Sequence, residues 1–305
     1  MDKIPCRVCG QGKSTSLGQI PDSGEFADQL VSPAIKGGQL WLCEDCGSLF
    51  RYPTLSGKEY LSFYEQVSSS VWIRDVAQRN DFSTIYAYLL NHNGGSILDI
   101  GCYGGAFLSG IPANFRKFGL EPSRSAAEVA TANGVEVLGQ TLADLAPDAV
   151  FDLLVAIDVI EHVLDVERFL VDALAHVDKD GTLIVSTGDP DCFYWKRIFR
   201  ARYWYSSLPE HLTFPSFKFF CEFAIRHELL PPERIRFKHI NLPPGTAIVS
   251  FLRQLIFALS PALYRAYVKL RRNMKGDASP LAENIPVGAP GLFRDQQVIL
   301  LKKRG

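Results

Sequence analysis

The middle of the chain, from about residue 80 to residue 190, alternates apolar runs of strand length with amphipathic segments of helix length. One amphipathic segment lies between Pro122 and Gly134, and a second follows Asp165, a residue type that caps helices. Strands that alternate with helices predict β-α-β units with right-handed crossovers, and therefore a parallel sheet covered by helices. The predicted strands occupy 96–100, 117–121, 135–138, 151–157 and 182–186.

The flanking regions have a different character from the middle. Two later apolar runs, at 235–240 and 298–302, can close the sheet, and the second follows a long excursion that allows an antiparallel orientation. Residues 1–60 consist of short strands and turns, whereas the region beyond residue 190 is aromatic, basic and less regular. We therefore predict an N-terminal lobe over 1–60 and a main domain over 61–305, with a helical insertion or lid at 245–290.

Composition narrows the class of protein. The 305 residues are 47% apolar and 21% charged with a net charge of −1, as in ordinary globular proteins. This balance argues against a dedicated nucleic-acid binder, which carries a basic excess. The N-terminus shows no apolar stretch of a secretory signal, and charged residues and Pro261 interrupt the most apolar stretch, 246–270. These observations predict a cytoplasmic protein without a membrane span.

A glycine-rich loop follows the first predicted strand, in the stretch ILDIGCYGGAF at 97–107. Glycines directly after a buried strand let the backbone turn tightly, and a helix that begins there points its amides at a bound group. The second strand ends at Glu121, whose carboxylate can accept hydrogen bonds from both hydroxyls of a ribose. The pattern indicates a nucleotide site. A dinucleotide site, whose fingerprint has a different glycine spacing, and a glycine-rich turn in another α/β enzyme are the alternatives.

The loop resembles the first motif of class I S-adenosylmethionine methyltransferases, Asp-x-Gly-x-x-x-Gly. The stretches 119–134, 151–163 and 169–189 are similar to later segments of that family in the same order, although Tyr103 stands where many members have glycine. The resemblance implies an α/β Rossmann-like fold with seven strands in the order 3-2-1-4-5-7-6, and S-adenosyl-L-methionine as cofactor. It implies cofactor contacts from Asp99, Gly101, Gly104, Gly105, Glu121, Leu142 and Asp158.

The adenine position departs from the family pattern. The family commonly has an acidic residue after the third strand, where this chain has Thr141. The backbone amide of Leu142 is the first candidate to contact the ring, and Asp144 is the second.

Four of the seven cysteines form a metal-type pattern, in which Cys6 and Cys9 precede a glycine, as do Cys43 and Cys46. Each C-x-x-C-G unit supplies two thiolates from one tight turn, and four thiolates in a tetrahedron suit Zn²⁺. Rubredoxin-like iron and redox dithiols are the alternatives. Because four thiolates leave no open coordination position, we expect a structural role, in folding a small lobe.

The lobe as a whole also resembles a known group. Methyltransferases that act on sugars and related metabolites often begin with such a zinc-binding lobe, followed by an aromatic stretch like that at 46–64. Tyr60, Phe63 and Tyr64 are candidates to border the pocket, with simple packing as the alternative.

Two acid–histidine pairs are candidates for the side that receives the methyl group. Glu210-His211 lies in a segment, 204–220, that resembles the Glu/His stretch of the zinc-lobed sugar C-methyltransferases, where such a pair serves as base. Leu208 replaces a tyrosine often seen there. The resemblance implies a catalytic or substrate-binding role for Glu210 and His211. The second pair, Glu161-His162, follows the fourth predicted strand. His162 is therefore a further candidate for a catalytic role, with simple packing as the alternative.

A divalent ion beside the fourth strand is an additional alternative. The spacing Asp158-x-x-Glu161-His162 resembles a metal motif of some O-methyltransferases.

Lysines and arginines cluster at 196–202 and again at 265–275, after the apolar stretch. A solvated helix face, phosphate contact with a sugar-linked substrate, and peripheral membrane contact through 246–275 are the interpretations that remain open.

The function predicted is methyl transfer from S-adenosylmethionine to a small molecule or glycan intermediate, such as a sugar nucleotide. The alternatives are an RNA methyltransferase and a non-catalytic module that binds the same cofactor.

Overall fold

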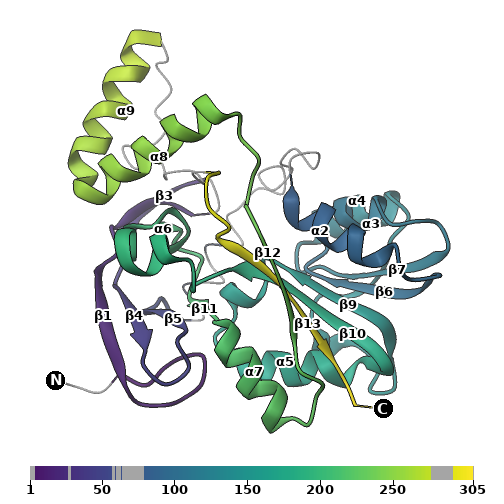
Figure 1. Cartoon of the computed structure of the whole chain (residues 1–305). Coiled ribbons are helices and arrows are strands. Elements are labelled where there is room, and N and C mark those ends of the chain that lie inside the picture. Colours follow the sequence, from purple (N-terminus) through teal and green to yellow (C-terminus); the bar gives the residue numbers. More distant parts are fainter. Residues whose placement is uncertain are drawn as a thin grey trace.

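The computed structural model describes residues 4–26, 29–56, 59, 63, 79–275 and 291–304. Its centre is a seven-stranded sheet in the order β12-β13-β10-β9-β6-β7-β8 (Figure 1). Counted along the sheet's own strands, this order is the predicted 3-2-1-4-5-7-6, so the fold class expected from the resemblance is confirmed. The strands are β6 (Gly95–Ile100), β7 (Phe115–Leu120), β8 (Glu136–Gly139), β9 (Phe151–Ile157), β10 (Val177–Gly188), β12 (Glu233–Phe237) and β13 (Gln296–Lys302).

Strand direction follows the connections. β6 pairs in parallel with both β7 and β9, and β9 pairs in parallel with β10. β13 runs antiparallel to β10 and to β12, which is the orientation that its long preceding excursion allowed. The carboxyl ends of the parallel strands therefore share one edge of the sheet, and that edge carries the candidate site.

Helices cover both faces of this sheet (Figure 1). On one face lie α2 (Asn80–Leu89), α3 (Ala106–Ser109) and α4 (Arg124–Ala132), and on the other lie α5 (Val166–Ala175) and α7 (Phe217–Arg226). Side chains alternate between the two cores along each strand: Leu153 and Val155 face the first group, whereas Leu154 and Ala156 face the second. Strands buried on both faces read as continuous apolar runs, which is why the sequence revealed them.

The two helices predicted in the middle region begin where the sequence indicated. The Ser123 side chain accepts a hydrogen bond from the Ala126 amide at 3.4 Å, and Asp165 accepts one from the Arg168 amide at 2.9 Å. Both are N-caps, which satisfy amides that the first helical turn leaves without a partner. Helix α2, by contrast, was not predicted, although Phe82, Ile85 and Leu89 give it a buried face.

The N-terminal lobe contains a four-stranded antiparallel sheet in the order β1-β4-β5-β11, and a separate two-stranded ribbon of β2 and β3. The edge strand β11 comes from far along the chain and pairs with β5 through Thr213 and Phe214. The lobe sheet is thus completed by a segment that lies outside the predicted lobe. Its strands are β1 (Ser14–Gln19), β2 (Ser23–Phe26), β3 (Gln29–Ile35), β4 (Gln39–Cys43), β5 (Leu49–Tyr52) and β11 (Thr213–Phe214).

Between β10 and β11 the chain forms short helical turns that pack against the lobe. Trp195 and Tyr203 stack there with ring centroids 5.2 Å apart, and both side chains are fully buried. This aromatic core explains the composition of the region, which the sequence indicated only as irregular. The turns are a π-helical segment (Tyr194–Phe199), a 3-10 turn (Arg200–Arg202) and α6 (Trp204–Ser207).

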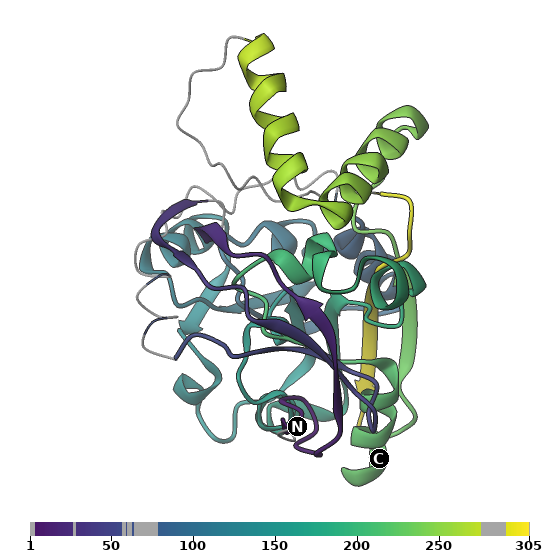
Figure 2. The same cartoon turned by 90° about the vertical axis from the view of Figure 1, so that its left-hand side faces the viewer.

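A helical hairpin follows β12, formed by α8 (Pro244–Leu259) and α9 (Pro261–Lys275). It rises from one end of the molecule, away from the seven-stranded sheet (Figure 2). The hairpin begins one residue before the predicted insertion at 245–290 and overlaps it as far as residue 275, and 276–290 is outside the described residues. None of the described helices is long and apolar enough to cross a membrane.

A buried arginine joins the lobe to the segment that precedes β11. The Arg51 side chain, 2% exposed, lies on β5 and donates hydrogen bonds to four backbone carbonyls. The bonds range from 2.8 to 3.1 Å, and three of the four acceptors lie within 206–211. A guanidinium has five donors in a fixed fork, which suits several carbonyls at once. The acceptors are Gly37, Ser206, Leu208 and His211.

We expect Arg51→Met to lower the free energy of unfolding by about 3–5 kcal/mol, because it leaves several buried carbonyls without donors. Arg124→Met is the matched control, since the Arg124 side chain is 93% exposed on α4, and it should stay within about 0.5 kcal/mol of the parent. Denaturant unfolding of both variants measures the difference. Equal stability of the two would contradict the anchoring role.

Candidate active site

The glycine loop connects β6 to α3 through backbone conformations that favour glycine. Gly101 has φ 74° and Gly105, the N-cap of α3, has φ 76°. A Cβ on Gly105 would also lie 2.9 Å from a methyl group of Val135, closer than carbon atoms approach. Tyr103 takes φ 48°, so the loop keeps a left-handed turn at the position where glycine is common in the family. Gly104 completes the loop, and a Cβ there would lie 3.2 Å from Val129.

Glu121 lies directly after β7 and faces this loop. Its side chain is 8% exposed, and burial raises its pKa. One carboxylate oxygen accepts from the Tyr103 amide at 2.9 Å and the other from the Ser123 amide at 2.7 Å. A carboxylate has about four acceptor positions, so two remain for a ligand. The loop and the acid therefore form one continuous surface at the ends of the first two parallel strands.

An ion-pair network at the ends of β6 and β9 was not predicted from the sequence. Arg79, just before α2, donates to the Asp158 carboxylate at 2.6 Å and to Asp81 as well. Asp158 takes φ 52° directly after β9, and its amide donates to the Ser186 carbonyl at 3.0 Å. Burial raises the pKa of Asp99 to about 8, while the nearby Arg79 charge acts in the opposite direction. The sequence around Arg79 contains no pattern that indicates a contact with Asp158, 79 residues away.

The segment after β8 places Leu142 beside the Glu121 strand end. The Glu121 amide donates to the Gly139 carbonyl at 3.0 Å, which brings the two strand ends together. The Asp144 carboxylate accepts from the Gln140 and Thr141 amides, each at 2.8 Å, and these bonds lower its pKa. Asp144 thus caps its own 3-10 turn (Leu142–Asp144), whereas Leu142 stands at the start of that turn.

The two acid–histidine pairs lie together, although 48 residues separate His162 from Glu210. His162 follows β9 in a 3-10 turn (Ile160–His162), and its ring centroid is 4.9 Å from that of His211. The Nδ1 of His162 lies 2.9 Å from the Glu210 carbonyl, and the Nδ1 of His211 lies 3.0 Å from the Tyr205 carbonyl.

These contacts fix the tautomer of both rings. A carbonyl only accepts, so each Nδ1 carries the proton and each Nε2 keeps its lone pair. Burial lowers the pKa of His162, and burial together with the neighbouring His162 lowers that of His211 well below the usual value. Both imidazoles are therefore neutral near pH 7.

Glu161 lies beside His162 and His211 and is fully buried. It accepts one hydrogen bond from the Tyr205 hydroxyl and another, at 3.0 Å, from Thr187. Burial raises its pKa to about 8, and the Asp158 charge adds to this effect. Ligand atoms of Glu161, His162 and His211 lie within 4.8 Å of one another. Each Glu161 oxygen already accepts a hydrogen bond from a side-chain hydroxyl, so we interpret the cluster as a hydrogen-bonded group rather than a metal centre. We call Glu161, His162, Glu210 and His211 the acid–histidine wall.

The four cysteines of the lobe converge as the spacing predicted. Sulfur–sulfur distances are 3.9 Å between Cys6 and Cys46 and 3.7 Å between Cys9 and Cys43. Zinc–sulfur bonds of about 2.3 Å in a tetrahedron give edges of about 3.8 Å, so the cluster fits Zn²⁺.

The two knuckles are built alike. The glycines that follow them, Gly10 and Gly47, have φ 71° and 76°. Their amides donate to the carbonyls of Cys6 and Cys43 at 2.9 and 3.0 Å. Each glycine therefore closes a tight turn that holds two sulfurs on one side. The predicted aromatic border is only partly described: Phe63 stacks on Phe26 with centroids 5.4 Å apart, and Tyr60 and Tyr64 lie outside the described residues.

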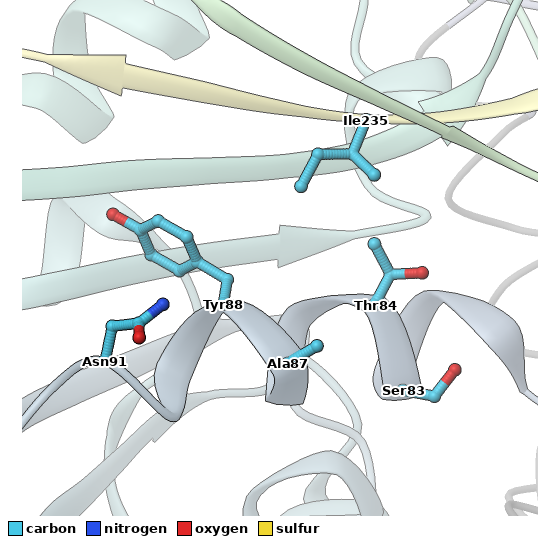
Figure 3. A pocket seen from close by; sticks show the side chains of 6 residues that line it. All are labelled: Ser83, Thr84, Ala87, Tyr88, Asn91 and Ile235. Carbon is cyan, nitrogen blue, oxygen red and sulfur yellow. The ribbon is translucent and has the colours of Figure 1, made fainter.

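A shallow depression between α2 and β12 is separate from these groups (Figure 3). It is open, and none of the predicted site residues lines it. Its lining residues are Ser83, Thr84, Ala87, Tyr88, Asn91 and Ile235. We therefore do not assign the site to it.

Comparison with known families decides the kind of protein. A family model described as a methyltransferase domain matches residues 74–254, which is more than half of the chain. The chain belongs to this methyltransferase family. The match confirms the resemblance that the glycine loop and the strand pattern indicated.

Two curated relatives are ubiquinone biosynthesis O-methyltransferases. The chain is 35% identical over 98 residues to that of Rickettsia conorii, covering 30% of this chain and 34% of the relative. It is 29% identical over 152 residues to that of Rickettsia canadensis, covering 43% of this chain and 63% of the relative. The methyltransferase thus matches less than two thirds of the length of either relative.

Solved structures support the fold. Phosphoethanolamine N-methyltransferase 2 of Haemonchus contortus, in complex with S-adenosyl-L-methionine, superposes with a TM-score of 0.51 at 14% identity, covering 84% of this chain and 62% of that one. A chain of the complex between the Haloferax volcanii Trm112 methyltransferase activator and a putative methyltransferase has a TM-score of 0.50 at 13% identity, covering 73% and 90%.

We expect metal analysis of the purified methyltransferase to find about one zinc per chain, because the sulfur distances match a Cys₄ tetrahedron. Cys43→Ser should lose the metal and lower the melting temperature. Cys221→Ser, on α7 and outside the cluster, should keep it. Iron in the parent protein, or a folded parent without metal, would refute the zinc assignment.

Proposed function

We propose that this methyltransferase binds S-adenosyl-L-methionine across the ends of β6, β7 and β8 and transfers its methyl group to a small molecule or a glycan intermediate. The observation that carries the proposal is the buried Glu121 carboxylate, which faces a glycine loop and retains two acceptor positions. Loop and acid together suit an adenosine-type ligand, in which a ribose diol needs an acceptor and close backbone approach.

The residues present fit that cofactor. Glu121 would accept the ribose hydroxyls, and Gly101, Gly104 and Gly105 would leave room for the chain that carries the sulfur. Leu142 would offer its backbone at the adenine. Asp158, held in place by Arg79, would contribute the negative charge that suits a cationic sulfonium. Asp99, whose pKa burial raises to about 8, is mostly protonated near pH 7 and would offer the cofactor a hydrogen bond instead. When bound, the cofactor supplies an activated methyl group, so the protein mainly aligns the acceptor with it.

The acceptor side of the proposal is formed by His162, Glu210 and His211. Both imidazoles keep an Nε2 lone pair, because each Nδ1–H is engaged by a carbonyl. A neutral imidazole can take the proton of a hydroxyl or an acidic C–H as the methyl group is transferred, an effect of about 10²–10⁴-fold. Of the two, His211 lies deeper, at 5% exposure, and is fixed on both sides by Tyr205 and His162.

The class of acceptor is the finer part of the proposal. A sugar nucleotide or related glycan intermediate agrees with the zinc-lobed group that residues 1–60 resemble. The names of the two Rickettsia relatives favour transfer to oxygen of a small molecule. RNA is disfavoured by the net charge of −1. We further propose that the protein works in the cytoplasm with a structural zinc in its lobe.

The proposal is tested by incubating the protein with methyl-labelled cofactor and separate panels of sugar nucleotides, phenolic compounds and RNA. Label should enter a small molecule. Transfer to RNA alone, or cofactor binding without transfer to any panel, would replace it by one of the two alternatives.

We expect Glu121→Gln to raise the dissociation constant for the cofactor by about 10–100-fold, because hydrogen bonds to a charged acceptor are each worth about 1.5–3 kcal/mol. Glu128→Gln, whose side chain on α4 is 68% exposed, is the control and should bind as the parent does. Calorimetric titration gives both constants. An unchanged constant for Glu121→Gln would rule out the ribose contact.

His211→Asn should reduce kcat by about 10²–10⁴-fold while leaving cofactor affinity unchanged, because the Asn amide can still donate to the Tyr205 carbonyl but has no basic nitrogen. His227→Asn, at the end of α7, should leave kcat unchanged. The parent's kcat/KM should fall only below about pH 6.5, the ordinary histidine value, since burial lowers the pKa of His211 and the base must be neutral. An acid limb above that pH, or full activity of His211→Asn, would contradict the base role.

A further inference from the structure

The α8–α9 hairpin carries large apolar side chains that are exposed in the described part of the chain. On α8, Ile248, Leu252 and Leu259 recur at spacings that place them on one side of the helix, and on α9 Leu263 and Leu270 do the same. Leu259 and Leu263, on either side of the turn between the helices, are 73% and 64% exposed. We call these five side chains the hairpin surface.

The hairpin is nevertheless attached firmly, so this exposure is not the result of a loose segment. Its opposite side is buried, through Phe257 and Tyr264 in the aromatic core. The Gln254 side chain is fully buried, accepts from the Trp204 amide at 3.0 Å and donates to the Arg202 carbonyl at 2.8 Å. The hairpin surface therefore faces outward on a well-anchored support, at the end of the molecule seen in Figure 2.

The charge of the hairpin is of one sign. From residue 239 to residue 275 the chain contains no Asp or Glu, although the whole chain has a net charge of −1. A segment that combines apolar side chains with cations and lacks anions matches the interface of a membrane, where acyl chains lie beneath anionic phosphates. The cations in this segment are Arg253, Arg265, Lys269, Arg271, Arg272 and Lys275.

We propose that the α8–α9 hairpin docks the methyltransferase on an anionic lipid surface. The alternative occupant, a second copy of the chain, is less well matched. A two-fold interface presents the same patch from both copies and would place two copies of the segment 239–275, which contains no Asp or Glu, against each other. Since none of the described helices can span a bilayer, the hairpin lies on the surface.

Docking would orient the proposed acceptor side toward the membrane. Two contacts join the hairpin to the chain just before the acceptor side: Arg202 donates to the Ala258 carbonyl at 2.6 Å, and the Trp204 amide donates to Gln254. The segment that carries Tyr205 and His211 follows directly. This consequence rests on the proposed function and points to an acceptor held at or near lipid. The docking itself does not depend on that function, because lipid binding is measured without cofactor or acceptor.

The test uses the full-length protein in co-sedimentation with phosphatidylcholine vesicles, with and without phosphatidylglycerol. We expect binding to the anionic vesicles that weakens as salt is added, and binding at least about tenfold weaker to the neutral ones. The double variant Leu259→Glu/Leu263→Glu should lose binding by about tenfold or more. Ile225→Glu, which alters a 78% exposed side chain on α7, is the matched control and should bind as the parent does.

Separate measurements distinguish docking from unfolding and from self-association. Cofactor affinity and melting temperature should be the same in the double variant as in the parent. Equal binding to both kinds of vesicle, or no binding at low salt, would overturn the proposal. Concentration-dependent dimers that the double variant abolishes, without vesicle binding by the parent, would assign the surface to a second copy instead.

Discussion

The parallel pairing of β6 with both β7 and β9 is the constraint on which the rest of the site depends. Because these strands run in the same direction, Gly101, Glu121 and Asp158 all emerge at one edge of the sheet, although helices α3 and α4 separate them along the chain. The glycine loop follows β6, Glu121 follows β7, and His162 follows β9, where it meets His211 from the segment before β11. A ligand that bridges these strand ends therefore has one side on the loop and its other side on the histidines.

The acid–histidine wall itself depends on contacts between distant segments. Glu161 on the β9 side meets Tyr205 from the segment before β11, and His162 meets the Glu210 backbone. That segment is in turn held from the lobe by the Arg51 guanidinium. Apart from any metal that it binds, the lobe thus helps to position His211, because Arg51 on its β5 strand holds the backbone of the segment that carries this histidine.

Much of the central fold could be predicted from the sequence because buried parallel strands leave continuous apolar runs between helix caps. The strand at 151–157, the helix between Pro122 and Gly134 and the cap at Asp165 agree with the structure for this reason. The cysteine pairs were equally informative, since two thiolates three residues apart have few other uses.

Other features were missed for different reasons. Helix α2 was not predicted although Asn80 and Asp81 precede its buried apolar positions, whereas Arg79 acquires its role only from partners 2 and 79 residues away. The proximity of His162 to His211 likewise depends on tertiary folding. Each histidine could be proposed singly from its neighbours in sequence, but their shared position and their tautomers come from backbone carbonyls of distant residues.

The pairing of β11 with β5 also limits how this protein can be divided. The lobe sheet takes its outer strand from Thr213 and Phe214, and Arg51 takes three of its four acceptors from the segment just before them. Cutting the chain after the lobe would expose an unpaired strand edge on each fragment and separate a buried cation from its carbonyls. The lobe therefore cannot be exchanged between related proteins by itself. A lobe moved to another protein would need the 206–214 segment of its own parent to be moved with it.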